Sequence, residues 1–311
     1  MQQKDSLRPL RGIVPPLATP LKAYDTLDSA GLEVLIEHVL SGRPQALLIL
    51  GTTGEGPALS YALRRNLIQQ VCRQVAERVP VLVGISDSSY AESLRMAEHA
   101  AKCDAAAIVA APPFYLPMAQ TDLLRLTESL TRDAELPLFL YNPPGLPRVS
   151  FEPETAARAA EMPKVAGVKD SSGQIGYIRQ VLSLLDGRHP EFSVLVGPEH
   201  LLAEALLLGA HGGVPGGANI FPHLPPQLYR LFLEGKFEEM QQVQKRIVDI
   251  GSAIWSSDKS DKGSLRRLKC ALSVLQLCEG VPTWPYEPSS EQERRHIADH
   301  LASHGILPHK R

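Results

Sequence analysis

The chain has 311 residues, which is enough for one large domain or two of average size. Hydrophobic residues make up 44% and charged residues 21% of the chain, as in an ordinary globular protein. Lys and Arg total 32 and Asp and Glu total 34, for a formal charge of −2. This balance gives no basic field for nucleic acid or an anionic membrane, so the expected partner is a small molecule. No long apolar run or signal pattern is found, and we expect a cytoplasmic location.

Short apolar runs alternate with longer amphipathic segments along the first two thirds of the chain. The runs are apolar throughout, a pattern typical of parallel strands that are covered on both faces. The predicted strands are Gly12 to Leu17, Ala46 to Leu50, Val81 to Ile85, Ala105 to Ala110, Leu138 to Tyr141, Val165 to Lys169, Ser193 to Val196 and Gly212 to Pro215. The predicted helices between them are Ser29 to Leu40, Leu59 to Arg78, Tyr90 to Lys102, Thr121 to Asp133, Pro153 to Glu161, Gln174 to Leu185 and Glu199 to Leu208.

Eight strand and helix units in this order favour a (β/α)8 barrel, also called a TIM barrel. No G-x-G-x-x-G motif follows the first strand, so the open sheet of a dinucleotide-binding protein is not indicated. From about Phe221 onward the pattern contains helices only. The sequence therefore predicts a barrel domain over residues 1–222 and a C-terminal helical extension over residues 223–311.

Lys169 ends an otherwise apolar predicted strand, in the run Val165-Ala-Gly-Val-Lys169. Barrel enzymes carry their active sites at the C-terminal ends of the strands. Desolvation at such a position favours the neutral amine, which can attack a ketone and form a Schiff base. For an isolated lysine, extension into solvent or pairing with Asp170 is the simpler interpretation. The neighbouring motifs favour the nucleophile.

A loop of sequence Gly51-Thr-Thr-Gly-Glu55 follows the second predicted strand. Its glycines allow backbone N–H groups to turn inward and its hydroxyls add further donors, which suits the carboxylate of a 2-oxo acid. The alternative is a glycine-rich turn in which Thr52 or Thr53 only caps the next helix. The loop lacks the lysine and spacing of a nucleotide-binding P-loop.

Tyr141 ends the fifth predicted strand, which lies beside the strand of Lys169 in a barrel. Imine formation requires proton transfers at the carbinolamine oxygen. A phenol hydrogen-bonded to a threonine hydroxyl of the Gly51–Glu55 loop could carry out these transfers. The alternative is a rim tyrosine whose hydroxyl binds backbone.

Five motifs in this order resemble those of the dihydrodipicolinate synthase and N-acetylneuraminate lyase family, over nearly the whole chain. They are the loop of residues 51–55, Pro-Pro-Phe-Tyr115, Tyr141-Asn-Pro-Pro, Gly167-Val-Lys-Asp, and Gly209-Ala-His-Gly-Gly-Val-Pro-Gly-Gly-Ala-Asn219. The resemblance implies a TIM barrel with a helical C-terminal extension, no metal or organic cofactor, and a homotetramer.

The resemblance also assigns roles to single residues. Lys169 would form the Schiff base, Thr52 and Thr53 would hold the carboxylate with Gly51 in the same loop, and Tyr141 would relay protons. Tyr115 would approach Thr53 from a neighbouring subunit and complete the relay. Two further positions, Gly197 and Val214, would line the pocket with backbone carbonyls.

One departure from the synthases and one match to the neuraminate lyases concern the substrate. The synthases have an arginine five residues after the equivalent of Tyr141, but Leu146 stands there and Arg148 comes two residues later. The lysine precursor is therefore not the expected product. Glu199 and His200 match a segment in which the neuraminate lyases bind sugar hydroxyls. Alternatively, Glu199 is a carboxylate at a helix N-terminus and His200 is exposed.

The expected function is that of a class I aldolase or lyase of a pyruvate-derived 2-oxo acid, such as a 2-keto-3-deoxy sugar acid. A 4-hydroxy-tetrahydrodipicolinate synthase-like condensation and a 2-keto-3-deoxy sugar acid dehydratase remain alternatives that use the same imine. A non-catalytic 2-oxo acid binding protein is an alternative from a different class. The aldehyde half of the substrate and the physiological direction stay open at this point.

Overall fold

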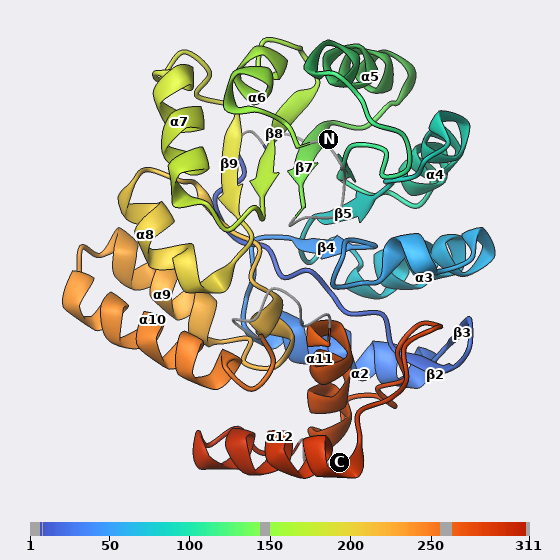
Figure 1. The fold of residues 1–311 in the computed structure, drawn as a ribbon, viewed down its shortest axis with the longest axis vertical. Coiled ribbons are helices and arrows are strands. Elements are labelled where there is room, and N and C mark those ends of the chain that lie inside the picture. Colours follow the sequence, from blue (N-terminus) through green and yellow to red (C-terminus); the bar gives the residue numbers. More distant parts are fainter. Residues whose placement is uncertain (1–6, 8, 144–149, 256–262, 309–311) are drawn as a thin grey trace.

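A computed structural model describes residue 7 and residues 9–143, 150–255 and 263–308. Eight parallel strands form one sheet whose order is β1-β10-β9-β8-β7-β6-β5-β4. The two outer strands of this order meet through a parallel bridge between Pro16 and Leu48, so the sheet closes into a barrel. The strands are β1 (Gly12–Ile13), β4 (Leu47–Ile49), β5 (Val81–Gly84), β6 (Ala107–Ala110), β7 (Leu138–Asn142), β8 (Val165–Asp170), β9 (Ser193–Val196) and β10 (Gly212–Gly213). The predicted TIM barrel is confirmed (Figure 1).

Helices surround the barrel in the order that the sequence predicts (Figure 1). They are α2 (Ser29–Ser41), α3 (Tyr61–Val75), α4 (Tyr90–Lys102), α5 (Gln120–Asp133), α6 (Pro153–Ala159), α7 (Ile175–Leu185), α8 (Leu202–Leu207) and α9 (Leu224–Leu233). Short 3-10 helices are η1 (Gly56–Ala58), η2 (Glu199–Leu201) and η3 (Gly216–Asn219). Ser60 and Ser89 cap α3 and α4 by accepting hydrogen bonds from backbone N–H groups of the first turn.

Two differences from the predicted strands have local causes. The first strand ends at Ile13 because Pro15 and Pro16 have no N–H group to donate to a neighbouring strand. A two-stranded antiparallel hairpin, β2 (Leu21–Ala23) and β3 (Thr26–Leu27), occupies the connection from β1 to α2 and was not predicted. Its strands are too short for an alternating pattern to be recognised.

Buried side chains form two groups, one on each side of the sheet. The larger group lies between the strands and the surrounding helices. The smaller group fills the barrel interior and includes Leu48, Val109, Phe139 and Tyr141. Leu10 belongs to it too, and its backbone N–H donates to the Ser193 hydroxyl at 2.8 Å. The interior is thus a packed core, and space for a ligand remains at the strand ends.

A register shift between β7 and β8 decides which way Lys169 faces. Leu138 pairs with Val165 but Phe139 pairs with Gly167, so β8 carries one extra residue. Side chains alternate along a strand, and one added residue reverses the faces of all that follow. Lys169 consequently pairs with Tyr141 and shares its interior face. A Cβ on Gly167 would lie 2.9 Å from the Phe139 ring, so this position favours glycine.

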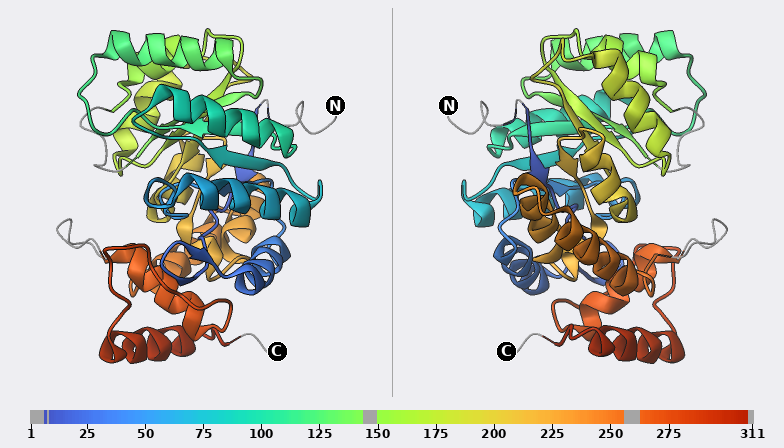
Figure 2. Two further views of the ribbon diagram at one scale, coloured as in Figure 1. Left: turned by 90° about the vertical axis from the view of Figure 1, so that its right-hand side faces the viewer. Right: turned by 90° about the vertical axis from the view of Figure 1, so that its left-hand side faces the viewer.

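The C-terminal helices continue from the ring and extend beyond it. Helix α9 packs against β1 and α8 and so completes the ring of barrel helices. Beyond it come α10 (Phe237–Gly251), α11 (Ser264–Val274) and α12 (Glu291–Ser303). Figure 2 shows α11 and α12 at one side of the barrel. The predicted division at residue 222 falls just before α9 and stays a prediction. No helix within the described ranges is long and apolar enough to cross a membrane.

Candidate active site

The strand-end lysine lies against the strand-end tyrosine in the barrel mouth. Lys169 Nζ is 3.9 Å from the centroid of the Tyr141 ring, and each of the two residues is 5% exposed. An amine over an aromatic face is in a favourable cation–π position and is largely removed from water. Lys169 and Tyr141 therefore form a buried pair of a nucleophilic and a proton-carrying group.

The loop after β4 brings a threonine to this pair. The Thr52 and Tyr141 hydroxyl oxygens are 2.9 Å apart, which is a hydrogen-bond distance. The Thr53 hydroxyl lies near η3, 3.9 Å from the position of a Cβ on Gly216. Gly51 begins the turn, and its carbonyl accepts a hydrogen bond from the Gly56 N–H at 3.2 Å. The loop thus presents two hydroxyls in distinct places.

This loop has an unusual backbone that neighbouring glycines make possible. Leu50 and Glu55 have φ values of 57° and 54°, in the left-handed region that non-glycine residues rarely adopt. A Cβ on Gly56 or Gly84 would lie 2.2 or 2.4 Å from the Leu50 carbonyl oxygen. Both positions therefore require glycine. A conformation of this kind persists where surrounding contacts hold it.

A buried ion pair provides such contacts from the C-terminal extension. Lys269 Nζ of α11 lies 2.5 Å from Glu55 Oε1, and the two side chains are 2% and 3% exposed. The other oxygen, Glu55 Oε2, accepts hydrogen bonds from the Thr283 N–H at 2.8 Å and the Thr283 hydroxyl at 2.7 Å. Lys269 Nζ also donates to the Val281 carbonyl at 2.6 Å. Burial lowers the pKa of Lys269, and the Glu55 carboxylate opposes this shift.

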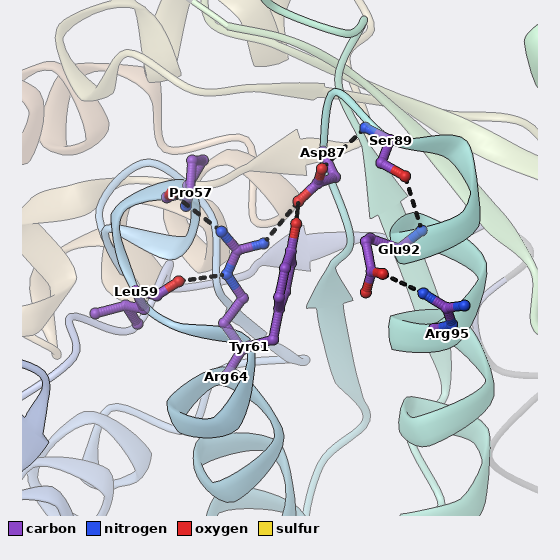
Figure 3. Close-up of polar contacts among 8 residues, drawn as sticks. All are labelled: Pro57, Leu59, Tyr61, Arg64, Asp87, Ser89, Glu92 and Arg95. Carbon is purple, nitrogen blue, oxygen red and sulfur yellow. Dashed lines mark hydrogen bonds and ion pairs between the residues drawn. The ribbon is translucent and has the colours of Figure 1, made fainter.

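An arginine fixes the residues that directly follow the Gly51–Glu55 loop (Figure 3). Arg64 donates to the carbonyl oxygens of Pro57 and Leu59, each at 3.0 Å, and pairs with Asp87 at 3.2 Å. The Tyr61 hydroxyl donates to the same Asp87 carboxylate at 3.0 Å. Arg64 therefore ties η1 to the β5–α4 loop, two segments that contribute to the wall of the pocket at the strand ends.

A small pocket lies beside these groups at the carboxyl ends of the strands. Its lining includes Thr52 and Tyr141 together with Ser86, Val109 and Phe114. A wider groove exists on the outer side of α2 and α3, but it contains none of the candidate residues. We assign the chemistry to the strand-end pocket because Thr52 and Tyr141 line it and Lys169 lies against the Tyr141 ring.

Asp170 has partners other than Lys169. Its carboxylate accepts hydrogen bonds from Asn142 Nδ2 at 2.8 Å and from the Ser172 hydroxyl at 2.9 Å. Burial raises the pKa of Asp170, while these hydrogen bonds oppose the shift. They fix the turn after β8, directly behind the lysine. Asp170 thus stabilises the strand end.

Gly197 follows β9, which pairs with the lysine strand β8, and Val214 follows β10 on the other side of β9. The Gly197 N–H donates to the Asp170 carbonyl at 2.6 Å, and a Cβ on Gly197 would lie 1.9 Å from the Ser171 hydroxyl oxygen. Val214 belongs to the interior core, and its N–H donates to the Val196 carbonyl at 2.7 Å. Both lie at the end of the barrel that holds the pocket, and their predicted carbonyl roles stay predictions.

Glu199 is buried, with donors at both carboxylate oxygens. The Gly217 N–H donates to Oε2 and the Trp255 Nε1–H donates to Oε1, each at 2.6 Å. Burial raises the pKa of Glu199 to about 7, against the effect of these hydrogen bonds. The neighbouring His200 is exposed. The predicted sugar contact of Glu199 stays a prediction. In the structure its carboxylate is hydrogen-bonded by groups of the protein.

Tyr115 lies away from the pocket within a single chain. Its side chain is 77% exposed, and the flanking Phe114 and Leu116 are 43% and 67% exposed. This agrees with a residue that acts only in an assembly, and its role stays a prediction. Leu146 and Arg148 lie outside the described residues.

Sequence reasoning missed three residues around the site, Arg64, Lys269 and Trp255. For Lys269 a signal existed, since it stands within an otherwise apolar stretch of a predicted helical segment. Among the described residues, no group of three or more His, Cys, Asp or Glu side chains could hold a metal ion.

Comparisons with known proteins agree with this geometry. Residues 9–304 match the model of the Dihydrodipicolinate synthetase family. A 4-hydroxy-tetrahydrodipicolinate synthase of Cereibacter sphaeroides is 33% identical over 96% of this chain and 100% of that protein. An Escherichia coli K12 protein named as a probable 2-dehydro-3-deoxy-D-pentonate aldolase is 28% identical over 97% of this chain and 100% of that protein.

Two solved structures share the fold. A dihydrodipicolinate synthase of Bacteroides thetaiotaomicron is 44% identical with a TM-score of 0.90, over 95% of this chain and 99% of that one. A prophage protein of E. coli K12 in complex with pyruvate is 25% identical, also with a TM-score of 0.90, over 96% and 100% of the two chains. Fold and site define an enzyme of the class I aldolase and lyase type. The chain belongs to the dihydrodipicolinate synthetase family.

Replacing Lys269 by Met would leave the Glu55 carboxylate buried without its cation. Removal of one partner of a buried ion pair lowers the free energy of unfolding by about 3–5 kcal/mol. Denaturant unfolding should show this loss, and the double variant Glu55→Gln/Lys269→Met should recover part of it because no charge remains buried.

The matched control is Lys245→Met, which removes a lysine whose side chain is 77% exposed and pairs with Asp249. Its effect should stay below about 1 kcal/mol. Equal losses for the two lysine variants would contradict a special role of the buried pair.

Proposed function

We propose that this enzyme cleaves, by way of a Schiff base on Lys169, a 2-keto-3-deoxy sugar acid or related hydroxy-oxo acid into pyruvate and an aldehyde. The observation that carries the proposal is the buried contact of Lys169 with Tyr141, whose hydroxyl is hydrogen-bonded to Thr52. A desolvated amine beside a two-hydroxyl relay has the groups that imine formation needs.

In the cleavage direction, the neutral Lys169 amine attacks the C2 ketone and forms a carbinolamine. Tyr141 delivers a proton to its oxygen, water leaves, and a protonated imine results. The imine draws electrons from C3 while Tyr141 accepts the proton of the C4 hydroxyl, so the C3–C4 bond breaks and the aldehyde departs. The enamine that remains takes up a proton at C3, and hydrolysis then releases pyruvate and the free amine.

The Gly51–Glu55 loop would hold the carboxylate of the 2-oxo acid. Thr53 is the better candidate for this contact, because the Thr52 hydroxyl is already engaged with Tyr141. Thr52 would then belong to the proton relay, and Tyr115 of a neighbouring subunit, which the resemblance places near Thr53, would complete that relay in a homotetramer. The exposure of Tyr115 supports this arrangement.

The names of the relatives support two substrate classes. One is a probable 2-dehydro-3-deoxy-D-pentonate aldolase, and several others are 4-hydroxy-tetrahydrodipicolinate synthases. Leu146, at the position of the synthase arginine, favours the sugar acid. A synthase-like condensation, a sugar acid dehydratase and a non-catalytic 2-oxo acid binding protein are the competing functions.

Borohydride reduction in the presence of pyruvate should attach one pyruvate-derived group to the Lys169 peptide, as measured by mass spectrometry. Reduction fixes the imine as a stable secondary amine. The control is Lys164→Arg, a lysine five residues earlier that donates to the Ala134 carbonyl, and this variant should be labelled normally. Pyruvate binding without an adduct would refute covalent catalysis.

Thr52→Val and Thr53→Val should have different kinetic effects. Loss of the Thr52 hydroxyl interrupts the relay, so kcat should fall by about 10²-fold or more, as it should for Tyr141→Phe. Loss of the Thr53 hydroxyl weakens carboxylate binding in ground and transition states alike, so KM should rise with little change in kcat. Steady-state kinetics separate the two, and identical profiles would contradict the division of roles.

A panel of 2-keto-3-deoxy sugar acids and N-acetylneuraminate, with pyruvate detected by a coupled assay, should identify at least one acid that releases pyruvate. A dehydratase would consume the acid without releasing pyruvate. A synthase would instead condense pyruvate with a semialdehyde, the second substrate that the synthase arginine binds, and would release no pyruvate from these acids. Thermal stabilisation by these acids without any turnover would favour the binding protein.

A further inference from the structure

Trp255 is half-buried. It follows α10 in the C-terminal extension and lies at the mouth of the barrel. The six-membered edge of its indole lies 2.9 to 3.0 Å from the position of a Cβ on Gly216, in η3 after β10. The Thr53 hydroxyl lies 3.9 Å from that same position. Trp255 and Thr53 thus border one glycine from two directions, and any side chain at Gly216 would displace the indole.

The indole is held by Glu199. Its Nε1–H donates to Glu199 Oε1 at 2.6 Å, while Glu199 Oε2 accepts from the Gly217 N–H at 2.6 Å. Gln244 fixes the backbone of Glu199, because Gln244 Nε2 donates to the Glu199 carbonyl at 2.9 Å. The ring edge bearing Nε1 is therefore turned toward the protein. The rest of the ring is apolar, and its six-membered edge borders Gly216.

This placement is informative about the part of the substrate that departs as aldehyde. Lys169, Tyr141 and Thr52 surround the carbon that forms the imine, and Thr53 lies farther along the mouth toward β10. An aromatic ring just past Thr53 is suited to the C–H surface of an extended chain, since ligand pockets combine apolar rings with few polar groups.

We infer that Trp255, held by Glu199, is a specificity-determining residue that packs against the aldehyde half of a 2-oxo acid substrate with a chain of five or more carbons. The inference rests on the proposed Schiff-base function and adds to it a residue that contacts the aldehyde half of the substrate. Glu199 acts here as a positioning residue. It affects specificity indirectly, because it holds the Trp255 indole and the Gly217 backbone in place.

The experiment uses tryptophan fluorescence, because the chain has two tryptophans and the other, Trp284, is 69% exposed. In the Trp284→Phe protein, emission reports on Trp255 alone. Pyruvate should form its borohydride-trapped adduct at Lys169 and leave the emission unchanged. 2-Keto-3-deoxygluconate or the corresponding five-carbon acid should shift or quench it. No change of emission with either acid would overturn the inference.

Kinetics provide the second readout. Trp255→Ala should raise KM for the sugar acid by about tenfold while changing the rate of pyruvate trapping less than twofold, and Trp255→Phe should restore most of the loss. Glu199→Gln, whose single carbonyl can satisfy one of the two donors, should reproduce part of the effect. Equal effects of Trp255→Ala on sugar acid and pyruvate would overturn the inference and leave the proposed function intact. If pyruvate gives no adduct in the unaltered protein, both fail.

Discussion

The buried ion pair between Glu55 and Lys269 is the contact on which the site geometry depends most. It joins the last residue of the Gly51–Glu55 loop to a helix outside the barrel, where neither charge has water to stabilise it. Since Glu55 is left-handed, the loop needs such an external hold to keep its shape. The position of the Thr52 hydroxyl next to Tyr141 follows from that shape. The C-terminal extension is therefore part of the active-site scaffold.

A second constraint lies within the sheet. The extra residue in β8 turns Lys169 to the interior, and the absence of a side chain at Gly167 leaves room for Phe139 in that core. Without the register shift the lysine would face the surrounding helices. The orientation of the nucleophile therefore depends on the irregular register of β8.

Sequence reasoning found the barrel, the strand ends, and the contact of Lys169 with Tyr141, because apolar runs and parallel pairing place strand-end residues together. It also expected a threonine partner for Tyr141, but a repeated Thr-Thr pair gives no indication of which hydroxyl turns inward. Glu55 and Thr283 stand 228 positions apart, and no periodic pattern connects them. The surroundings of Glu199 were not predicted for the same reason, because its partner Trp255 is distant from it in the sequence.

The dependence of the loop on α11 has a consequence for synthesis of the chain. All eight barrel strands precede Lys269 in sequence, so during translation the ring can assemble before its locking cation has been added. The nascent barrel then carries the lysine, the tyrosine and the threonines, but the Glu55 carboxylate still lacks its partners Lys269 and Thr283. The complete set of contacts around the Gly51–Glu55 loop therefore forms only after the last helices have been made. A chain that ended before Lys269 would lack these partners of Glu55.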